Sequence, residues 1–342
     1  MRSYSKAENP WVAIWLSVMV FLVVSMIVFG GATRLTNSGL SITEWLPITG
    51  AIPPLSEAQW ISEFDKYKQI SEFLAEHPDM DLSGFKFIYF MEWGHRQLGR
   101  IIGLAFALPY FYLLITRALP AGRTWRFFII LLLIGIQGAI GWWMVYSGLK
   151  DDRVSVSQYR LATHLGMAFI ILAALYWSRQ DARQKWPSRT RKISFKTRST
   201  ILSAMIFLQI ISGAFVSGTG AGKTYNSWPL MDGSFFPDGY FQLAPLWKNM
   251  FENIAAIQFN HRFLAYIILI MAVWVFISTH GRNLLVNKRS RALLFILIFQ
   301  AGLGIVTLLS VAPLYLALMH QFIAIFVFLS ALSLARAAWV QT

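Results

Sequence analysis

The residues best suited to chemistry in this sequence are four histidines that recur in two matched settings. Two of them precede an arginine, within Glu92-Trp93-Gly94-His95-Arg96 and Gln258-Phe259-Asn260-His261-Arg262. His164 and His320 follow these two by 69 and 59 residues, each inside an apolar run. A histidine within a membrane helix is costly and needs a partner. Four histidines in matched settings therefore predict two copies of one site, each with two imidazoles.

The leading chemistry for such a pair is axial ligation of a haem iron by imidazoles from facing helices. Zinc and non-haem iron sites usually add carboxylates or closely spaced histidines, whereas each histidine here is alone on its predicted helix. The absence of cysteine excludes disulfides, thiolate ligands, c-type haem attachment and Cys-ligated iron–sulfur clusters. The pattern favours bis-imidazole haem, with a non-haem metal as the rival.

The elements that position these histidines are predicted to be membrane helices. The 342 residues are 56% hydrophobic and 13% charged, whereas a soluble domain carries about 25% charged residues. Long uncharged apolar runs predict an all-α polytopic membrane protein with eight transmembrane helices. The first run exceeds the apolar region of a signal peptide, so we expect it to be retained as a helix. The expected spans are roughly 11–30, 97–116, 125–146, 160–178, 199–217, 260–279, 291–311 and 314–335.

The net charge of +14 indicates topology rather than a nucleic-acid partner. Eight Lys and Arg lie between residues 179 and 198, on the side of the predicted helices that holds both termini. Nine of the 16 Asp and Glu lie between residues 31 and 94, on the opposite side. This positive-inside bias predicts cytoplasmic termini. The N-terminal tail is too short for a mitochondrial presequence, which favours a bacterial inner (cytoplasmic) membrane, or a mature chain.

The basic segment 181–198 divides the eight helices into two halves, 1–180 and 199–342. An even number of helices in each half gives both the same orientation, which predicts a parallel repeat of two four-helix bundles. Gln137-Gly138-Ala139-Ile140-Gly141 and Gln300-Ala301-Gly302-Leu303-Gly304 recur in the third and seventh helices. We expect the histidines near the outer ends of their helices, under the long segments 31–94 and 218–259. An amphipathic helix is predicted near 56–75, and His77 is expected to be an ordinary surface residue.

Small residues follow each of the four histidines by four positions, namely Gly99, Ala168, Ala265 and Ala324. Positions i and i+4 share a helix face, so these residues leave room for a flat macrocycle beside each imidazole. Ordinary helix packing, which also favours small residues, is the alternative.

The two histidine pairs differ in one neighbouring residue. Glu92 precedes His95 by three residues, and Gln258 holds the same position before His261. A carboxylate can exchange protons with a substrate, which a glutamine cannot. This difference predicts one catalytic site, with Glu92, His95 and His164, and one site that keeps a permanent cofactor. Arg96 and Arg262 are candidates to pair with haem propionates, although snorkelling to the interface explains them as well.

On these residues the chain resembles the haem A synthase family. The similarity covers nearly the whole chain, and the long first outer segment looks like the mitochondrial and alphaproteobacterial type. Some bacterial members carry a cysteine pair in that segment, which this chain lacks. The motifs that carry the resemblance are Gly30-Gly31-Ala32-Thr33-Arg34-Leu35-Thr36-Asn37-Ser38-Gly39-Leu40-Ser41, Glu44-Trp45, Glu92-Trp93-Gly94-His95-Arg96, Asn226-Ser227-Trp228-Pro229-Leu230-Met231-Asp232-Gly233 and Asn260-His261-Arg262.

The resemblance implies a membrane oxidoreductase that converts haem O to haem A. A methyl group is oxidised to a formyl group through successive hydroxylations, and the product serves terminal oxidases. The family assigns His261 and His320 to a bound haem b, and His95 and His164 to the substrate haem. Its important glutamate falls on Glu92. The implied partners are haem O, membrane lipid, an electron donor and possible contacts with haem O synthase and terminal oxidase assembly factors.

Two other functions fit parts of the pattern. A dihaem cytochrome b that exchanges electrons with quinone uses the same four histidines, but it does not need the Glu92/Gln258 difference. A haem transporter with a parallel repeat predicts no redox-active haem.

Overall fold

The computed structural model describes residues 10–119, 122–150, 153–183, 193–280 and 284–341. Within these ranges the chain is helical, and one isolated bridge between Met231 and Ser234 is its only β-type pairing. Eight helices are long and apolar enough to cross a membrane, which confirms the predicted fold class. They are α1 (Pro10–Leu35), α4 (Leu82–Ile115), α5 (Thr124–Gly148), α6 (Gln158–Arg183), α7 (Ile193–Gly218), α9 (Ile254–Thr279), α10 (Leu284–Leu309) and α11 (Leu314–Gln341).

Two of these helices begin well before the predicted spans. The start of α4 is Leu82 rather than a residue near 97, and the start of α9 is Ile254 rather than 260. Asp81 caps α4 by accepting a hydrogen bond from the Gly84 amide at 2.7 Å, and Asn253 caps α9 at the Ala255 and Ala256 amides. Polar residues such as Glu92 and Arg96 in α4, and Gln258 and Asn260 in α9, interrupt the apolar runs, so the predicted spans began too late. His95 therefore lies well inside α4 and not at its start.

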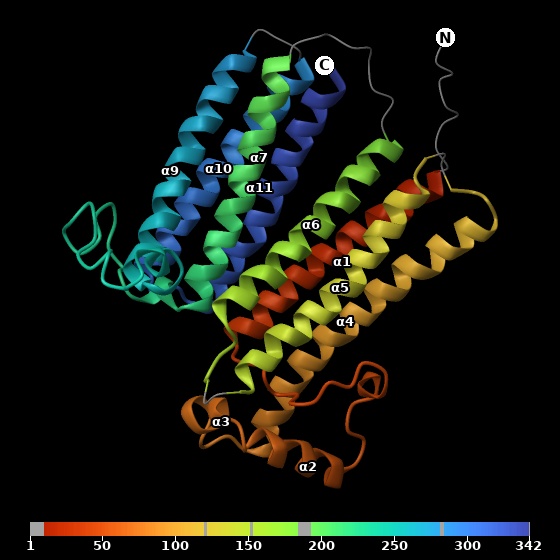
Figure 1. The fold of residues 1–342 in the computed structure, drawn as a ribbon, viewed down its shortest axis with the longest axis vertical. Coiled ribbons are helices and arrows are strands. Elements are labelled where there is room, and N and C mark those ends of the chain that lie inside the picture. Colours follow the sequence, from red (N-terminus) through yellow and green to blue (C-terminus); the bar gives the residue numbers. More distant parts are fainter. Residues whose placement is uncertain (1–9, 120–121, 151–152, 184–192, 281–283, 342) are drawn as a thin grey trace. The chain divides into compact units, whose positions relative to one another are not determined.

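The chain forms two compact units, residues 1–175 and 176–342 (Figure 1). In the second unit α7, α9, α10 and α11 form a closed bundle in which each helix packs against two others. In the first unit α1 packs against α4, and α4 against α5. Each unit contains one predicted histidine pair. The repeat, the roles of the two halves and the side of the membrane that holds the termini remain predictions.

The predicted basic linker at 181–198 is partly helical. Residues 184–192 lie outside the described residues, but α6 continues to Arg183 and α7 already begins at Ile193. Asp181, inside the predicted linker, forms an ion pair with Arg336 of α11. The connection between the halves is therefore shorter than the charge pattern predicted, because basic residues at helix ends belong to the helices.

The first outer segment folds over the start of α4. It contains a 3-10 turn, η1 (Thr49–Ala51), and two helices, α2 (Glu57–Tyr67) and α3 (Ser71–Glu76), where one helix near 56–75 was predicted. Ser56 and Gln59 form a capping box at the start of α2. The second outer segment contains only short helices, η2 (Ala221–Lys223), η3 (Leu246–Lys248) and α8 (Asn249–Glu252).

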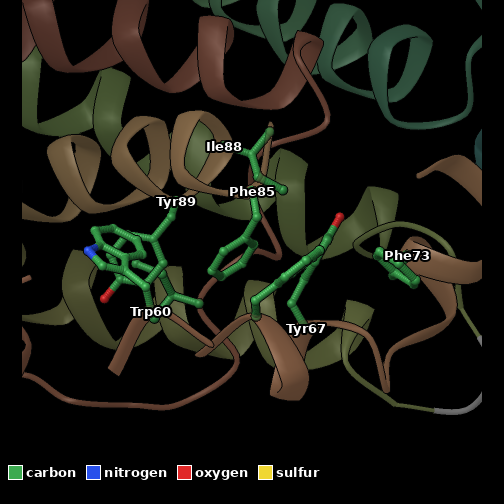
Figure 2. Close-up of a cluster of buried hydrophobic side chains, with 8 residues drawn as sticks. Trp60, Tyr67, Phe73, Phe85, Ile88 and Tyr89 are labelled. Atoms are coloured by element: carbon green, nitrogen blue, oxygen red, sulfur yellow. The ribbon is translucent and has the colours of Figure 1, made fainter. Parts of the chain in front are cut away.

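An aromatic core joins α2 and α3 to the first turns of α4 (Figure 2). Phe85 of α4 is fully buried, stacks on Phe64 at 4.9 Å between ring centroids, and meets Trp60 edge-on. The buried residues Phe85, Ile88, Tyr89 and Glu92 recur every three or four positions, as expected for one face of a helix. The same face therefore buries an apolar core and places the Glu92 carboxylate beneath the outer segment.

Candidate functional site

The four histidines stand on α4, α6, α9 and α11, and each ring packs against a glycine of another membrane helix. A methyl group added to Gly141, Gly213 or Gly304 would lie 3.0, 3.3 or 2.8 Å from Cε1 of a histidine ring. The rings concerned are those of His164, His261 and His320. At Gly30 the nearest ring atom is Nε2 of His95, at 2.8 Å. Glycine at these four positions lets each imidazole approach the backbone of its neighbouring helix.

The structure brings together the pairs that the sequence predicted. His95 lies near His164 in the first unit, and His320 lies near His261 in the second. Among the described residues no group of three or more His, Cys, Asp or Glu is arranged to hold a metal ion. Each site in this part of the chain therefore offers two imidazoles without a carboxylate ligand.

Three of the histidines share a contact with a glutamine four residues before the glycine. The amide nitrogens of Gln137, Gln209 and Gln300 donate to the backbone carbonyls of His164, His261 and His320 at 3.0, 2.9 and 2.9 Å. The same nitrogens lie close to the rings, as in Gln209 Nε2 at 3.1 and 3.2 Å from the two ring nitrogens of His261. A donor in the ring plane cannot approach both nitrogens this closely, so the amide covers the ring face.

These pairs fit a haem iron. Each supplies two imidazoles at glycine-lined helix contacts, and imidazole is a common axial ligand of haem. Several buried polar atoms beside them have no hydrogen-bond partner among the described residues, namely His164 Nδ1 and Oε1 of Gln137, Gln209 and Gln300. Buried polar atoms are usually satisfied, so such a group of atoms indicates a place for a ligand or water.

Glu92 is buried and accepts hydrogen bonds at both carboxylate oxygens. Its Oε2 receives the Ser41 hydroxyl and the Ile42 amide, both at 2.8 Å. Its Oε1 receives Nε and Nη2 of Arg96, at 3.1 and 2.7 Å. Because Ser41 and Ile42 lie in the chain that follows α1, the Glu92 carboxylate joins that chain to α4.

Gln258 makes the matching connection in the second unit. Its amide nitrogen donates to the Ala221 carbonyl at 2.8 Å, and its oxygen accepts from Nη2 of Arg262 at 2.9 Å. The polarity of the loop contact is therefore reversed: the carboxylate accepts a loop N–H, and the amide donates to a loop carbonyl. Arg96 is paired with a negative charge, whereas its counterpart Arg262 is paired with a neutral amide.

The two arginines hold the outer segments by their backbone carbonyls. Arg96 donates to the carbonyls of Ile42 and Glu44, and Arg262 to those of Tyr225 and Ser227. Nε of Arg262 is buried without a partner among the described residues. Pairing of either arginine with a haem propionate remains a proposal.

The small residues after the histidines have varied surroundings. A methyl group added to Gly99 would lie 3.1 Å from Cε of Met26, so this position packs against α1. At Gly103, one turn further on, an added methyl would meet nothing within 4 Å. The predicted space for a macrocycle therefore stays a proposal.

One predicted surface histidine is not ordinary. His77 is half-buried, and its Nδ1 lies 2.8 Å from the hydroxyl of Tyr67, which also donates to the buried Glu72. Burial raises the pKa of Glu72 to about 8, and the charge of Glu92 adds to this effect. The expectation of a simple surface role failed because hydropathy could not show that α3 folds back against Tyr67.

Sequence reasoning also missed several residues of the site. Ser41 was noted only as the last residue of a family motif, and its contact with Glu92, 51 positions away along the chain, needed the structure. Gln137 and Gln300 were noticed only as marks of a repeat. Their pattern, a glutamine four residues before a glycine, also occurs at Gln209 and Gly213 and would have revealed the shared contact.

Comparison with known proteins decides the family. The model of the COX15-CtaA family, described as cytochrome oxidase assembly protein, matches residues 13–332. The chain belongs to this family. Relatives named Heme A synthase are similar over most of their length. The protein from Ruegeria sp. (strain TM1040) is 47% identical over 92% of this chain and 85% of its own. That from Paracoccus denitrificans is 45% identical over 94% and 86%, and that from Maricaulis maris 45% over 99% and 98%.

The predicted membership is thereby confirmed, and the matched range includes all four histidines. These relatives are alphaproteobacterial, which agrees with the type that the long first outer segment predicted.

Proposed function

We propose that this chain is a haem A synthase, an integral membrane oxidoreductase that converts haem O to haem A. The observation that carries the proposal is the pair of imidazoles in each unit, every ring seated on a glycine. The relatives named Heme A synthase, at 45–47% identity, support the same activity. A methyl group of haem O is oxidised to a formyl group through successive hydroxylations, and haem A then serves terminal oxidases.

The two pairs take different haems in this proposal. His261 and His320 hold a resident haem b, and His95 and His164 hold the haem O substrate. When bound, the haem irons supply the redox chemistry, and the protein supplies binding, orientation and polarity. Arg262 is bonded to the neutral Gln258 rather than to a carboxylate, and its buried Nε has no partner among the described residues, which favours an anionic propionate near the resident site.

Glu92 has a positioning role in this proposal. Both of its oxygens are occupied by protein donors, so the carboxylate fixes Arg96 and the backbone of Ile42 above His95. This contact holds the outer segment over the substrate site and limits the access of water. A direct part in proton transfer would require Glu92 to give up one of these bonds.

The proposed location is a bacterial inner membrane with both termini in the cytoplasm and the two outer segments on the opposite face. If molecular oxygen provides the hydroxyl oxygen, an electron donor must supply two electrons for each hydroxylation, two protons are taken up, and the second oxygen atom leaves as water. Haem O synthase and terminal oxidase assembly factors are the proposed protein partners, since they would supply the substrate and use the product.

The test is to express the full chain with a supply of haem O and to extract the haems for chromatography. We expect haem A and its hydroxylated precursor from the wild type. Absence of both would overturn the proposed activity. A reduced-minus-oxidised spectrum of the purified protein tests the assignment: the b-type signal is expected to disappear in His261→Ala and His320→Ala and to remain in His95→Ala. A dihaem cytochrome b would give the spectrum without product, and a transporter would give neither.

A further inference from the structure

The four histidine settings are alike in their glycine contacts and differ in one residue. Gln137, Gln209 and Gln300 each stand four positions before the glycine that receives a histidine ring. In α1 the same position, four before Gly30, is Met26. The glutamine contact is therefore present for three histidines and replaced by a thioether for His95.

The glutamine restricts its histidine in two ways. Its amide nitrogen donates to the histidine carbonyl, which holds the glutamine beside the imidazole. The nitrogen then covers the ring face of His261 and His320, and at His164 it lies 3.5 Å from Nε2. Gln300 repeats the arrangement of Gln209, with Nε2 at 3.2 and 3.4 Å from the two ring nitrogens of His320. Neighbouring groups that orient a metal-ligating histidine typically change metal affinity about 10–100-fold when they are mutated.

Met26 cannot make these contacts. A thioether has no N–H to donate to the His95 carbonyl and is only a weak acceptor. Its Cε is directed to Gly99. Among the described residues no side chain forms a hydrogen bond with the His95 ring, and the ring's aromatic neighbour is Phe29, at 6.4 Å between centroids.

The orientation of the His95 ring also differs from the others. At Gly141, Gly213 and Gly304 the nearest ring atom is Cε1, and Nδ1 is the next nearest. At Gly30 the nearest atom is Nε2 itself, at 2.8 Å from the position of an added methyl group. The His95 ring therefore presents Nε2 to its glycine, whereas the other three rings present their Cε1 edge.

We infer that Met26 makes His95 the exchangeable ligand of the substrate haem, while the glutamines keep His164, His261 and His320 as fixed ligands. The inference rests on the proposed function, since it requires haem at both pairs. It has a chemical reason. A substrate haem must enter and its product must leave, so one of its two imidazoles has to release the iron readily, whereas a resident haem needs two firm ligands.

The experiment measures haem release from the full-length protein in detergent. Haem O is bound to the purified protein, and its transfer to excess apomyoglobin is followed by absorbance. Met26→Gln is expected to slow the release of haem O by roughly 10-fold or more, by giving His95 the missing amide. Met26→Leu, which has a similar volume and no amide, is the matched control and is expected to behave as the wild type.

Gln137→Met provides the converse change on the other ligand of the same site. We expect it to accelerate haem O release and to leave the resident haem b unaffected. Carbon monoxide binding to the ferrous protein gives a second readout, since the ligand displaces a loosely held imidazole. It is expected to be fast at the substrate haem of the wild type and slow in Met26→Gln.

The outcomes separate the inference from the proposed function. If wild type and His95→Ala bind no haem O at all, or bind it equally, the proposed substrate site fails. If haem O binds through His95 but Met26→Gln and Met26→Leu release it at the same rate, the role of Met26 is overturned. If Met26→Gln does not fold, the Gln137→Met release rate decides, and an unchanged rate overturns the inference.

Discussion

Arg96 donates two hydrogen bonds to the carboxylate of Glu92, from Nε at 3.1 Å and from Nη2 at 2.7 Å. The same guanidinium binds the carbonyls of Ile42 and Glu44, so the ion pair also holds the chain that follows α1. In the second unit Gln258 and Arg262 hold the other outer segment without a carboxylate. The exchange of Glu92 for Gln258 therefore changes the hydrogen bonds that hold each outer segment to its membrane helix.

Glu92→Gln is expected to loosen the first outer segment. An amide cannot accept from Arg96 and from the Ile42 amide at once without turning its own NH₂ towards a donor. Removing one partner of a buried pair in this way costs about 2–4 kcal/mol. The measurements are thermal unfolding in detergent and the rate of limited proteolysis between residues 36 and 81.

The matched change in the second unit is Gln258→Glu, which loses the donor to the Ala221 carbonyl and is expected to loosen residues 219–253 instead. One result of the Glu92→Gln experiment would contradict the positioning role proposed for Glu92. If Glu92→Gln abolishes haem A formation while the unfolding temperature and the proteolysis rate stay unchanged, Glu92 acts on the substrate directly and the positioning role is refuted.

Gly304→Ala is expected to displace the His320 ring and to weaken the resident haem. The added methyl would lie 2.8 Å from Cε1, so the ring or the helix must move. Overpacking of this kind costs about 1–3 kcal/mol. The height of the b-type band in a reduced-minus-oxidised spectrum, per mole of protein, checks the effect.

Gly302→Ala is the control on the same helix, since its added methyl meets nothing within 4 Å. It is expected to keep the full b-type band. Gly213→Ala, with a wider 3.3 Å contact to His261, should fall between the two. Equal bands in Gly302→Ala and Gly304→Ala would show that the resident haem does not depend on the His320 contact.

The sequence could predict the membrane helices and the histidine pairs because both depend on local signals. Apolar runs report burial in lipid, and a histidine within such a run is costly enough to indicate a site. The starts of α4 and α9 were missed because polar residues such as Glu92 and Gln258 interrupt the apolar runs after the caps at Asp81 and Asn253. The first turns of α4 pack against α2 and α3, a contact that the hydropathy of α4 alone does not show.

The partners of the site residues needed the structure. Glu92 was recognised from its place before His95, but its contacts with Ser41 and Ile42 cross about 50 positions of sequence. The glutamine contacts were within reach, because the four-residue spacing from glycine repeats in three helices. The exception at Met26 acquires meaning only when the glycines are seen to receive the histidine rings.

Phe85→Ala is expected to destabilise the outer segment without affecting the second unit. Phe85 is fully buried in the aromatic core of Figure 2, and removal of such a ring costs about 3–5 kcal/mol. Faster proteolysis between residues 36 and 81 is the expected result, with an unchanged b-type band. Phe87→Ala, at a position 59% exposed, is the control and should have little effect on proteolysis. Equal susceptibility of the two variants would mean that this core does not hold the segment.

The stability of α2 and α3 is expected to fall as the pH rises from about 5 to 8. Burial, with a contribution from the charge of Glu92, raises the pKa of Glu72 to about 8, from an ordinary value of 4.5. Between these values the folded segment keeps a proton that the unfolded segment has lost, so folding becomes less favourable with each step in pH. The full effect of one such proton is about 1.4 kcal/mol per pH unit, and partial solvent access reduces it to about 1 kcal/mol.

Hydrogen exchange of residues 57–76, corrected for the intrinsic effect of pH on exchange, measures this loss of protection. Glu72→Gln removes the titrating group and is expected to give protection that varies little over the same range. Glu76→Gln, an exposed residue of the same helix, is expected to retain the slope of the wild type. A slope that persists in Glu72→Gln would assign the pH dependence to another group, of which His77, bonded to Tyr67, is the nearest candidate in α2 and α3.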